Sequence, residues 1–320
     1  MNICQVSLKG NIPIIKENLK NFNKLYNDNY FYIVCPKKEK IFFNKKIKSS
    51  RVFFIEEESL IKFSKFKKIS NTYLKKTIYY NKIQNRLTWY YQQILKIAFL
   101  IDFVEKKKEN LVIWDADTIL IDRIVFFKER FSNYYGTTSY FHKAYYNTNN
   151  FILGKLPKYF ISSLAQFISI TPNEVNFLIK KISKRKKRLK NTSEWLTHII
   201  MKSISAVHLQ YNGSMFSEYE LIGQSNLLYN FRKQKLVSGI RDHLNGRLTI
   251  LQISILKYLG FKYIAYEHTH VNKNSKKMLT RQQTWAIFLK LLIKKLSNNF
   301  FRGLKHHLKY AISLFKPTIR

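Results

Sequence analysis

The strongest constraint on the fold is an alternation of short apolar runs with helical segments over the first 120 residues. Four runs rich in β-branched and aromatic residues predict strands at 3–8, 30–34, 51–55 and 111–114. Between them, apolar spacing predicts helices over 14–26 and over 88–107, the latter capped by Thr88. Strands separated by helices favour an α/β fold with a mostly parallel sheet, and such sheets bind ligands at the carboxyl ends of their strands.

The remainder of the chain is less regular. Residues 131–151 are rich in Tyr, Asn and Thr, which predicts a long loop or short strands. Residues 157–190 predict a helix, a loop and a second helix that starts at Pro172. Further elements are expected as helices at 216–228 and 249–259 and as a strand at 263–271.

Charge and cysteine content exclude several classes of protein. Lys and Arg number 57 against 19 acidic residues, a formal net charge of +38 that favours attraction to anionic surfaces. With only Cys4 and Cys35, the chain has neither a disulfide framework nor a four-cysteine zinc site. We see no signal-peptide pattern and no apolar run of the roughly 18–20 residues that span a membrane. We therefore expect a cytoplasmic protein, either free or peripheral on the inner face of the cell membrane.

The last part of the chain is chemically distinct. Glu267 is the final acidic residue, and the region from 276 to 320 carries two apolar stripes at helical spacing on a basic background. We therefore divide the chain into a domain over 1–275 and a basic amphipathic helical tail over 276–320. Basic amphipathic helices can lie at an anionic membrane surface, here through residues 281–320, or can close the fold of the domain before them. Both alternatives stay open from the sequence.

The most informative segment is an Asp-x-Asp motif directly after the predicted strand at 111–114. Of six Asp in the chain, Asp115, Asp117 and Asp122 fall within eight positions. Side chains two apart share a face of a strand, and carboxylate oxygens suit Mg²⁺ or Mn²⁺ with substrate phosphates completing the shell. The motif predicts a divalent-cation site, and the alternative is a turn that ends the strand, because Asp also favours turns.

The predicted helix upstream of this strand carries amide and amine donors near its start. Gln92 and Gln93 lie four and three positions before Lys96, so each neighbours it on the helix surface, and Trp89 precedes them by one turn. Such donors near a helix N-terminus can meet phosphate oxygens. The alternative is an ordinary amphipathic helix with a solvated polar face.

Three motifs in this order resemble an uncharacterised bacterial family of glycosyltransferase-like proteins. They are Trp-Tyr-x-Gln-Gln-x-x-Lys at 89–96, Asp-Ala-Asp-Thr at 115–118 and Phe-Ser-Glu-Tyr-Glu-Leu at 216–221, and the resemblance covers about residues 1–230. The helical Lys followed by a strand and Asp-Ala-Asp-Thr is also similar to glycogenin and lipopolysaccharide galactosyltransferases.

The resemblance implies a GT-A-like, Rossmann-related fold and a nucleotide-sugar donor. On this basis Asp115 and Asp117 would hold Mn²⁺ or Mg²⁺ and the donor diphosphate, with Trp89, Gln92, Gln93 and Lys96 binding the donor. Where the family is expected to have His residues, this chain has Ser163-Leu164-Ala165-Gln166-Phe167, which puts an acceptor role of that segment in doubt.

Two carboxylates in the third motif are candidates for the catalytic base that an inverting enzyme needs. Ser217 and Glu220 are spaced as a capping box, which favours a capping role for Glu220 over catalysis. Glu218 is freer of that role and is the first candidate as base or acceptor ligand. His268 is a further candidate, since glycogenin-like enzymes use a late His as a third metal ligand, although a His that packs on a strand is the favoured explanation of a lone His-x-His.

The sequence therefore predicts a metal-dependent, hexosyltransferase-like glycosyltransferase that acts on a lipid-linked or polysaccharide acceptor. One rival is a nucleic-acid-binding protein, suggested by the net charge and by the basic run at 180–190. We find none of the common nucleic-acid-binding motifs, so we expect no specific nucleic-acid partner. The other rival is a catalytically inactive GT-A-like scaffold. P-loop and dinucleotide-binding glycine motifs are both absent.

Overall fold

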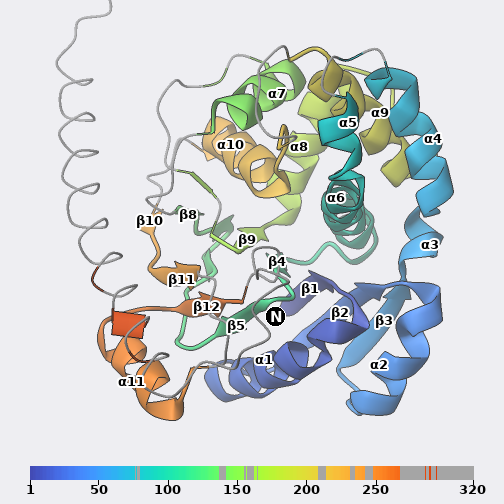
Figure 1. The fold of residues 1–320 in the computed structure, drawn as a ribbon. Coiled ribbons are helices and arrows are strands. Elements are labelled where there is room, and N and C mark those ends of the chain that lie inside the picture. The colour runs from blue at the N-terminus through green and yellow to red at the C-terminus, as the bar shows by residue number, and fades with distance from the viewer. Residues whose placement is uncertain are drawn as a thin grey trace, which may run out of the picture.

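A five-stranded sheet organises the chain in the computed structural model (Figure 1). The structure describes residues 1–75, 77, 80–136, 142–154, 156, 162–163, 165–207, 214–230, 235–241 and 248–266, with 285, 288, 289 and 293. The strand order is β3-β2-β1-β4-β9. Four strands are parallel: β1 (Asn2–Val6), β2 (Tyr30–Cys35), β3 (Val52–Glu56) and β4 (Leu111–Trp114). The fifth, β9 (Phe167–Ile170), is antiparallel to β4. The expected α/β class with a mostly parallel sheet flanked by helices is confirmed.

Apolar cores lie on both faces at the centre of this sheet, which explains why β2 and β4 are continuous hydrophobic runs. In β1, Ile3 packs into the core on one face of the sheet, and the next residue, Cys4, packs into the core on the other. In register, Cys4 pairs with Tyr32 on one side and Ile113 on the other.

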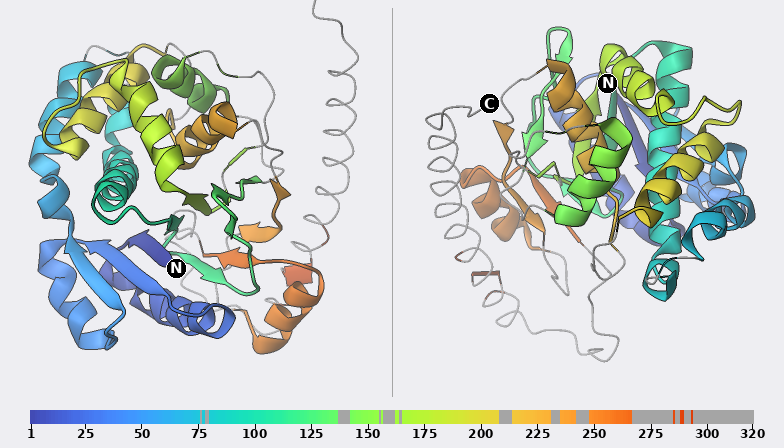
Figure 2. Two further views of the ribbon diagram at one scale, coloured as in Figure 1. Left: turned by 180° about the vertical axis from the view of Figure 1, so that it is seen from behind. Right: turned by 90° about the horizontal axis from the view of Figure 1, so that it is seen from above.

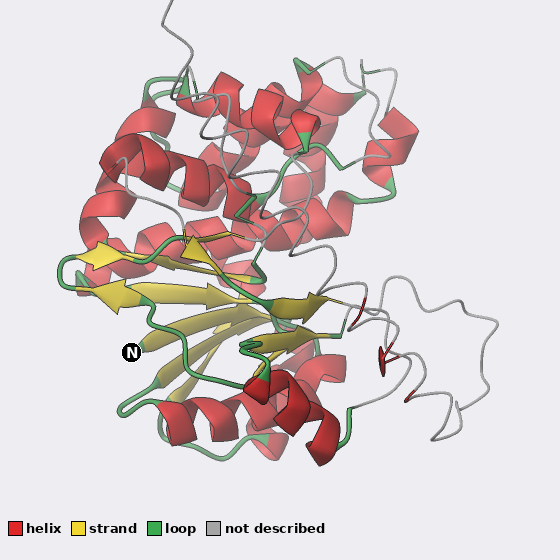
Figure 3. Cartoon of the chain, turned by 90° about the vertical axis from the view of Figure 1, so that its left-hand side faces the viewer, coloured by secondary structure: helices red, strands yellow, loops and turns green. Residues whose placement is uncertain are grey.

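Helices cover both faces, and the two layers differ in thickness (Figure 3). The thinner layer holds α1 (Ile12–Leu25) and α2 (Lys40–Lys46), which bury Phe22 and Phe43 against the sheet. The thicker layer is built around α6 (Leu87–Lys107). Its other members are α3 (Glu57–Leu60), α4 (Phe63–Leu74), α5 (Tyr80–Gln84), α7 (Lys143–Leu153), α8 (Pro172–Ser183), α9 (Thr192–Ser205) and α10 (Glu218–Asn230).

Helix α6 lies between the sheet and the outer helices, so it is buried on nearly every side, from Tyr90 to Val104. The predicted cap at Thr88 is wrong: the helix begins at Leu87, and its N-cap residue Arg86 makes no side-chain capping bond. Burial of apolar side chains stabilises this helix without a cap, because tertiary packing supplies most helical stability in proteins. Its last turn ends on Lys108 in the left-handed region, with φ 57°.

The segment predicted as a loop or short strands is part strand and part helix. Short strands lie at β6 (Phe127–Lys128), β7 (Phe131–Ser132) and β8 (Tyr135–Gly136), but residues 143–153 form α7. Asn and Tyr are indifferent helix formers, and here α7 is stabilised by burying Tyr145 and Ile152 in the helical layer. The Thr148 hydroxyl also donates to the Met215 carbonyl at 2.7 Å, which fixes α7 against the segment that precedes α10.

Helix α8 begins at Pro172, as predicted, and its first turn carries a fully buried carboxylate. Glu174 accepts hydrogen bonds from the Ser132 hydroxyl (2.7 Å), the Tyr134 hydroxyl (2.7 Å) and the Thr171 amide (2.8 Å). The Asn230 side chain at the end of α10 donates to the same carboxylate at 3.3 Å. Glu174 therefore joins β7, α8 and α10 at one point.

A second, three-stranded sheet follows the Asp-x-Asp segment. Its order is β11 (Gly239–Arg241), β12 (Tyr263–Ala265) and β5 (Thr118–Leu120), with β12 antiparallel to β5. Asn18 of α1 anchors β5: its amide donates to the Thr118 carbonyl, and its carbonyl accepts the Leu120 amide. A short strand β10 (Lys235–Leu236) pairs with β8.

Helix α11 (Ile250–Tyr258) packs beside the three-stranded sheet (Figure 2). It begins as predicted, and Thr249 and Gln252 form a capping box. The predicted strand at 263–271 is confirmed as far as residue 265, and residues 267–271 lie outside the described residues. Apart from four positions, the predicted tail at 276–320 also lies outside them. Within the described part of the chain, no helix is both long and apolar enough to cross a bilayer.

The basic run at 180–190 spans the end of α8 and the loop to α9. Arg188 in this run forms a two-pronged ion pair with Glu105 at the end of α6 and lies 5.6 Å from the ring centre of Trp195. The Trp195 indole donates to the Lys186 carbonyl at 3.0 Å. Part of the run therefore holds the α8–α9 loop against the helical layer.

Candidate active site

Asp115 follows the last residue of β4, at the carboxyl edge of the parallel sheet. Its amide donates to the Gln166 carbonyl at 2.9 Å, and its carbonyl accepts the Thr118 amide at 3.1 Å. Asp115, Ala116 and Asp117 thus form the turn between β4 and β5. The motif therefore lies both at the end of the strand and in a turn, the two positions that the sequence allowed. The sequence places carboxylates where ligands bind in sheets of this kind.

Lys96 of α6 reaches this edge and bridges two carboxylates from distant parts of the sequence. Its Nζ donates to Asp115 Oδ1, and to Glu218 Oε1 of α10 at 2.6 Å. The Tyr219 hydroxyl donates to Asp115 Oδ1 at 2.6 Å, and the ammonium lies 4.8 Å from the centre of the Tyr219 ring. We call Lys96, Asp115, Glu218 and Tyr219 the lysine cluster.

The lysine cluster is removed from solvent, which strengthens its internal electrostatics. The side chains of Lys96, Asp115 and Glu218 are 10%, 19% and 4% exposed. Burial alone disfavours the ammonium, but the Asp115 and Glu218 carboxylates outweigh it and raise the pKa of Lys96. Burial, together with the Asp115 charge, raises the pKa of Glu218 despite the nearby ammonium. Burial and the same two carboxylates raise the pKa of Tyr219, which keeps its hydroxyl a donor.

Asp117 lies at the rim of this cluster and is half-buried. The Thr118 hydroxyl donates to Asp117 Oδ1 at 3.3 Å, and the Asp117 carbonyl accepts the Tyr266 amide at 2.8 Å. Its charge is close enough to contribute to the raised pKa of Tyr219. Among the described residues, the carboxylates of Asp115, Asp117 and Glu218 therefore outnumber the Lys96 ammonium at this point.

The two carboxylates of the Asp-x-Asp motif suit a Mg²⁺ or Mn²⁺ ion that takes few ligands from the protein itself. Among the described residues, no group of three or more His, Cys, Asp and Glu side chains is arranged to hold a metal. Asp115 and Asp117 offer two carboxylates, which matches ions that bind one or two protein carboxylates and complete their shell with substrate phosphates and water. The predicted third ligand, His268, lies outside the described residues.

The predicted donor-binding side chains on α6 are placed at different depths. Gln93 is 2% exposed, and its Oε1 accepts the Glu218 amide at 3.2 Å, so it lies behind Glu218 and holds the first turn of α10. Gln92 is half-buried, one turn before Lys96. Trp89 packs with its ring 5.1 Å from that of Tyr90 and 5.4 Å from the Arg86 guanidinium. Only Lys96 of the four reaches Asp115 directly in the contacts described above.

The capping box predicted for Ser217 and Glu220 is wrong. The Ser217 hydroxyl is buried and has no hydrogen-bond partner among the residues that the structure describes. Glu220 instead accepts from the Ser162 hydroxyl at 2.6 Å and the Gln224 amide at 3.3 Å. The cause is the close approach of the 162–163 segment to α10, where a Cβ on Gly223 would lie 2.0 Å from the Ser163 hydroxyl. Burial raises the pKa of Glu220 to about 7. Glu218 is also not free, because Lys96 and Gln93 hold its side chain and amide.

Sequence reasoning missed two residues of this site. Tyr219 lies inside the motif at 216–221, but nothing in its spacing shows that its hydroxyl reaches Asp115. Gln166 has a left-handed φ of 62°, unusual for a residue other than glycine, and this turn aims its carbonyl at the Asp115 amide. The segment that departs from the family pattern therefore supports the Asp-x-Asp turn through its backbone.

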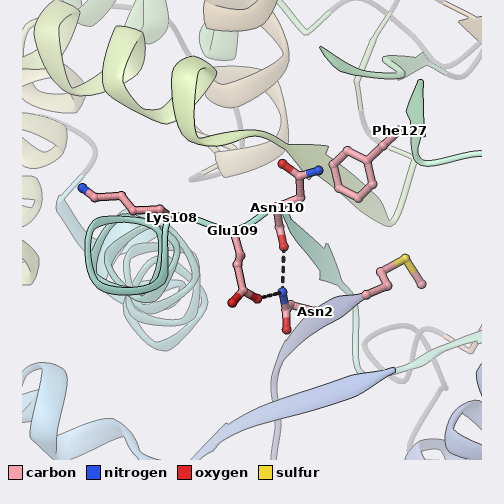
Figure 4. Close-up of a pocket in the computed structure, with 6 residues that line it drawn as sticks. Asn2, Lys108, Glu109, Asn110 and Phe127 are labelled. Atoms are coloured by element: carbon pink, nitrogen blue, oxygen red, sulfur yellow. Dashed lines mark hydrogen bonds between the residues drawn. The ribbon is translucent and has the colours of Figure 1, made fainter. Parts of the chain in front are cut away.

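A shallow cleft of about 420 Å³ opens at the opposite edge of the sheet (Figure 4). It lies at the amino ends of β1 and β4, where the Asn2 amide donates to Glu109 Oε2 at 2.8 Å and to the Asn110 carbonyl at 3.1 Å. Parallel sheets bind ligands at the carboxyl ends of their strands, so this cleft is on the wrong side for the site at Asp115.

Comparison with known proteins gives a likeness in structure only. No protein-family model matches the chain, and no curated protein matches its sequence. A solved structure of the galactosyltransferase LgtC with donor and acceptor sugar analogues has 11% identity and a TM-score of 0.43, over 91% of this chain and 95% of that chain. An active-site mutant of LgtC has 9% identity and a TM-score of 0.41, over 92% of this chain and 96% of that chain.

Proposed function

We propose that the chain is a metal-dependent glycosyltransferase of the GT-A type. It would transfer a sugar from a nucleotide-sugar donor to a lipid-linked or polysaccharide acceptor. The observation that carries the proposal is the lysine cluster, in which Lys96, Asp115 and Glu218 are buried together beside Asp117 at the carboxyl edge of β4. Buried charges with strongly perturbed pKa values at a ligand-binding edge are typical of functional sites.

Asp115 and Asp117 are the proposed ligands of the divalent cation. When bound, that ion would neutralise the charge that develops on the departing nucleoside diphosphate. Lys96 and the Tyr219 hydroxyl hold the Asp115 carboxylate in one orientation, and Lys96 adds a positive charge to the same edge. Trp89, Gln92 and Gln93 remain the proposed donor-binding group on α6, with Gln93 acting through Glu218. His268 stays the proposed third metal ligand.

Glu218 is the proposed base that takes the proton of the acceptor hydroxyl. Its raised pKa makes it a better proton acceptor than an ordinary exposed carboxylate, and its contact with Lys96 fixes its position. Glu220 is the second candidate, because burial raises its pKa to about 7. The basic segment at 281–320 is the proposed attachment to the inner face of an anionic membrane.

The test is calorimetric binding of nucleoside diphosphates with and without Mn²⁺. We expect Mn²⁺-dependent binding in the wild type and its loss in Asp115→Asn and Asp117→Asn. The matched control is Asp122→Asn, because Asp122 pairs with Lys262 outside the lysine cluster and should leave binding unchanged. Circular dichroism checks that each variant is folded.

Two outcomes would overturn the proposal. Unchanged binding in both Asn variants would show that the site assignment is wrong. A folded wild type that binds no nucleoside diphosphate under any condition would favour an inactive scaffold.

A further inference from the structure

Helix α11 exposes apolar side chains on its outer face. Ile250, Leu251 and Tyr258 are 85%, 61% and 91% exposed, and Leu259 directly after the helix is 38% exposed. In Figure 1 and Figure 2 the helix lies at the periphery of the molecule, beside β12. Clustered apolar side chains of this size on a surface mark a contact with a partner or a membrane.

The inner face of α11 packs against the rest of the molecule, so the exposed face is not needed to fix the helix in place. Leu256 is fully buried with Phe261 and Ile264 in a small core, which also takes Ile119 and Ile121 from the segment after Asp117. The capping box of Thr249 and Gln252 completes the helix start. The exposed residues Ile250, Leu251 and Tyr258 are not part of this core.

The charge around the outer face of α11 is positive. The described segment 248–266 contains no acidic residue, and Lys257 is exposed on α11 between the apolar side chains. The 53 residues after Glu267 carry 12 Lys or Arg and no acid. At the start of that region Trp285 and Phe288 pack against the same small core, and Leu289 and Ile293 are 48% and 67% exposed.

The size of the face argues against a second copy of the chain as the occupant. A helix of nine residues is roughly 14 Å long, whereas a stable protein interface buries about 800 Å² on each partner. Basic and apolar side chains on one helix, with an exposed tyrosine, are instead typical of helices that lie in a bilayer interface. We infer that the outer face of α11 contacts the surface of an anionic phospholipid bilayer.

The small sheet links this surface to the proposed site. β12 follows α11 after four residues and pairs with β5, and the Tyr266 amide donates to the Asp117 carbonyl. Helix α11 and the Asp-x-Asp turn therefore contact the same small sheet. The inference concerns binding alone and does not depend on the proposed sugar transfer.

The experiment is flotation of the full chain with vesicles of phosphatidylcholine, alone or mixed with phosphatidylglycerol. We expect the wild type to float only with the anionic vesicles. The double variant Ile250→Ser/Leu251→Ser should bind them at least about tenfold more weakly, with an unchanged melting temperature, because both side chains are already exposed. The matched control, Ile41→Ser/Val125→Ser, removes side chains that are 69% and 55% exposed elsewhere and should bind as the wild type does.

Several results would overturn the inference. One is flotation of the α11 variant at the wild-type level, which would assign the contact to residues 281–320. The inference is also wrong if the Ile41→Ser/Val125→Ser control binds anionic vesicles as weakly as the α11 variant. It is wrong too if the wild type binds neutral vesicles as well as anionic ones, or binds neither. Size-exclusion chromatography provides a further check, since a wild-type dimer that the α11 variant dissociates would assign the face to a second copy of the chain.

Discussion

Replacing Lys96 by Met tests whether the lysine cluster is held together by its one cation. The change keeps most of the side-chain volume and leaves the Asp115 and Glu218 carboxylates facing each other without the ammonium between them. Both the Lys96 and Glu218 side chains are at most a tenth exposed, so solvent screens them little. Removing one partner of such a pair costs about 3–5 kcal/mol of unfolding free energy, on the order of 5–10 °C in melting temperature.

The loss should depend on pH in a defined direction. Burial already raises the pKa of Glu218 above its ordinary value of 4.5, and without Lys96 the pKa rises further. A carboxyl whose folded-state pKa is raised destabilises the fold increasingly as the pH climbs from the unfolded-state pKa to the folded-state pKa. The deficit of the Lys96→Met variant should therefore be smaller at pH 5 than at pH 8, because Glu218 takes up a proton at the lower pH.

Urea denaturation followed by circular dichroism measures both effects. The control is Lys65→Met, because the Lys65–Glu194 pair at 2.5 Å involves a lysine side chain that is 55% exposed, and surface pairs contribute less than about 1 kcal/mol. Adding Glu218→Gln to Lys96→Met should restore part of the lost stability. A Lys96→Met variant as stable as the control at both pH values would refute the reasoning.

Three further predictions concern the surroundings of the site. Glu220→Gln should remove a loss of stability that the wild type shows as the pH rises, because burial raises the folded-state pKa of Glu220 to about 7. Between pH 5 and pH 8 the unfolding free energy of the wild type, measured by urea denaturation, should fall by about 2–3 kcal/mol relative to that of the variant. Gly223→Ala should cost about 1–3 kcal/mol in the same assay, because the new Cβ would lie 2.0 Å from the Ser163 hydroxyl, whereas Gly10→Ala, with nothing within 4 Å, should change little. Glu174→Gln should lower the melting temperature, because an amide NH₂ group would replace one carboxylate oxygen and would face the Ser132, Tyr134 and Thr171 donors without an acceptor. An unchanged melting temperature would show that these hydrogen bonds do not stabilise the fold.

The framework of the sheet could be predicted because local sequence decides it. Strand β4 was predicted with its observed bounds, and β1, β2 and β3 were each predicted to within two residues at either end. These strands are short runs rich in apolar side chains, and the central ones are buried, so hydrophobicity marks them in the sequence. Helix α7 could not be found in this way, since Asn and Tyr do not favour helix and its stability comes from contacts with α9 and α10.

The residues of the site could be predicted from the sequence, but most of the contacts between them could not. The Asp-x-Asp motif and Lys96 were identified from order and spacing, and the structure brings Asp115 and Lys96 into contact. The contacts of α10 depend on residues far away in the sequence: Ser162 is 58 positions from Glu220, and Asp115 is 104 positions from Tyr219. Sequence spacing therefore gave the wrong role for Glu220 and missed Tyr219. The 162–163 segment lies so close to α10 that Glu220 binds Ser162 instead of capping the start of the helix.

The central position of β1 has a consequence for synthesis on the ribosome. This strand is translated before both of its neighbours, and one of them, β4, begins only at Leu111 and is itself flanked by β9 from residue 167. At about 5–20 residues per second, roughly 5–20 s pass between the translation of β1 and that of β4. Throughout that interval β1, with its apolar side chains Ile3, Cys4 and Val6, lacks its β4 partner, so the nascent chain is a natural client for chaperones that shield hydrophobic segments.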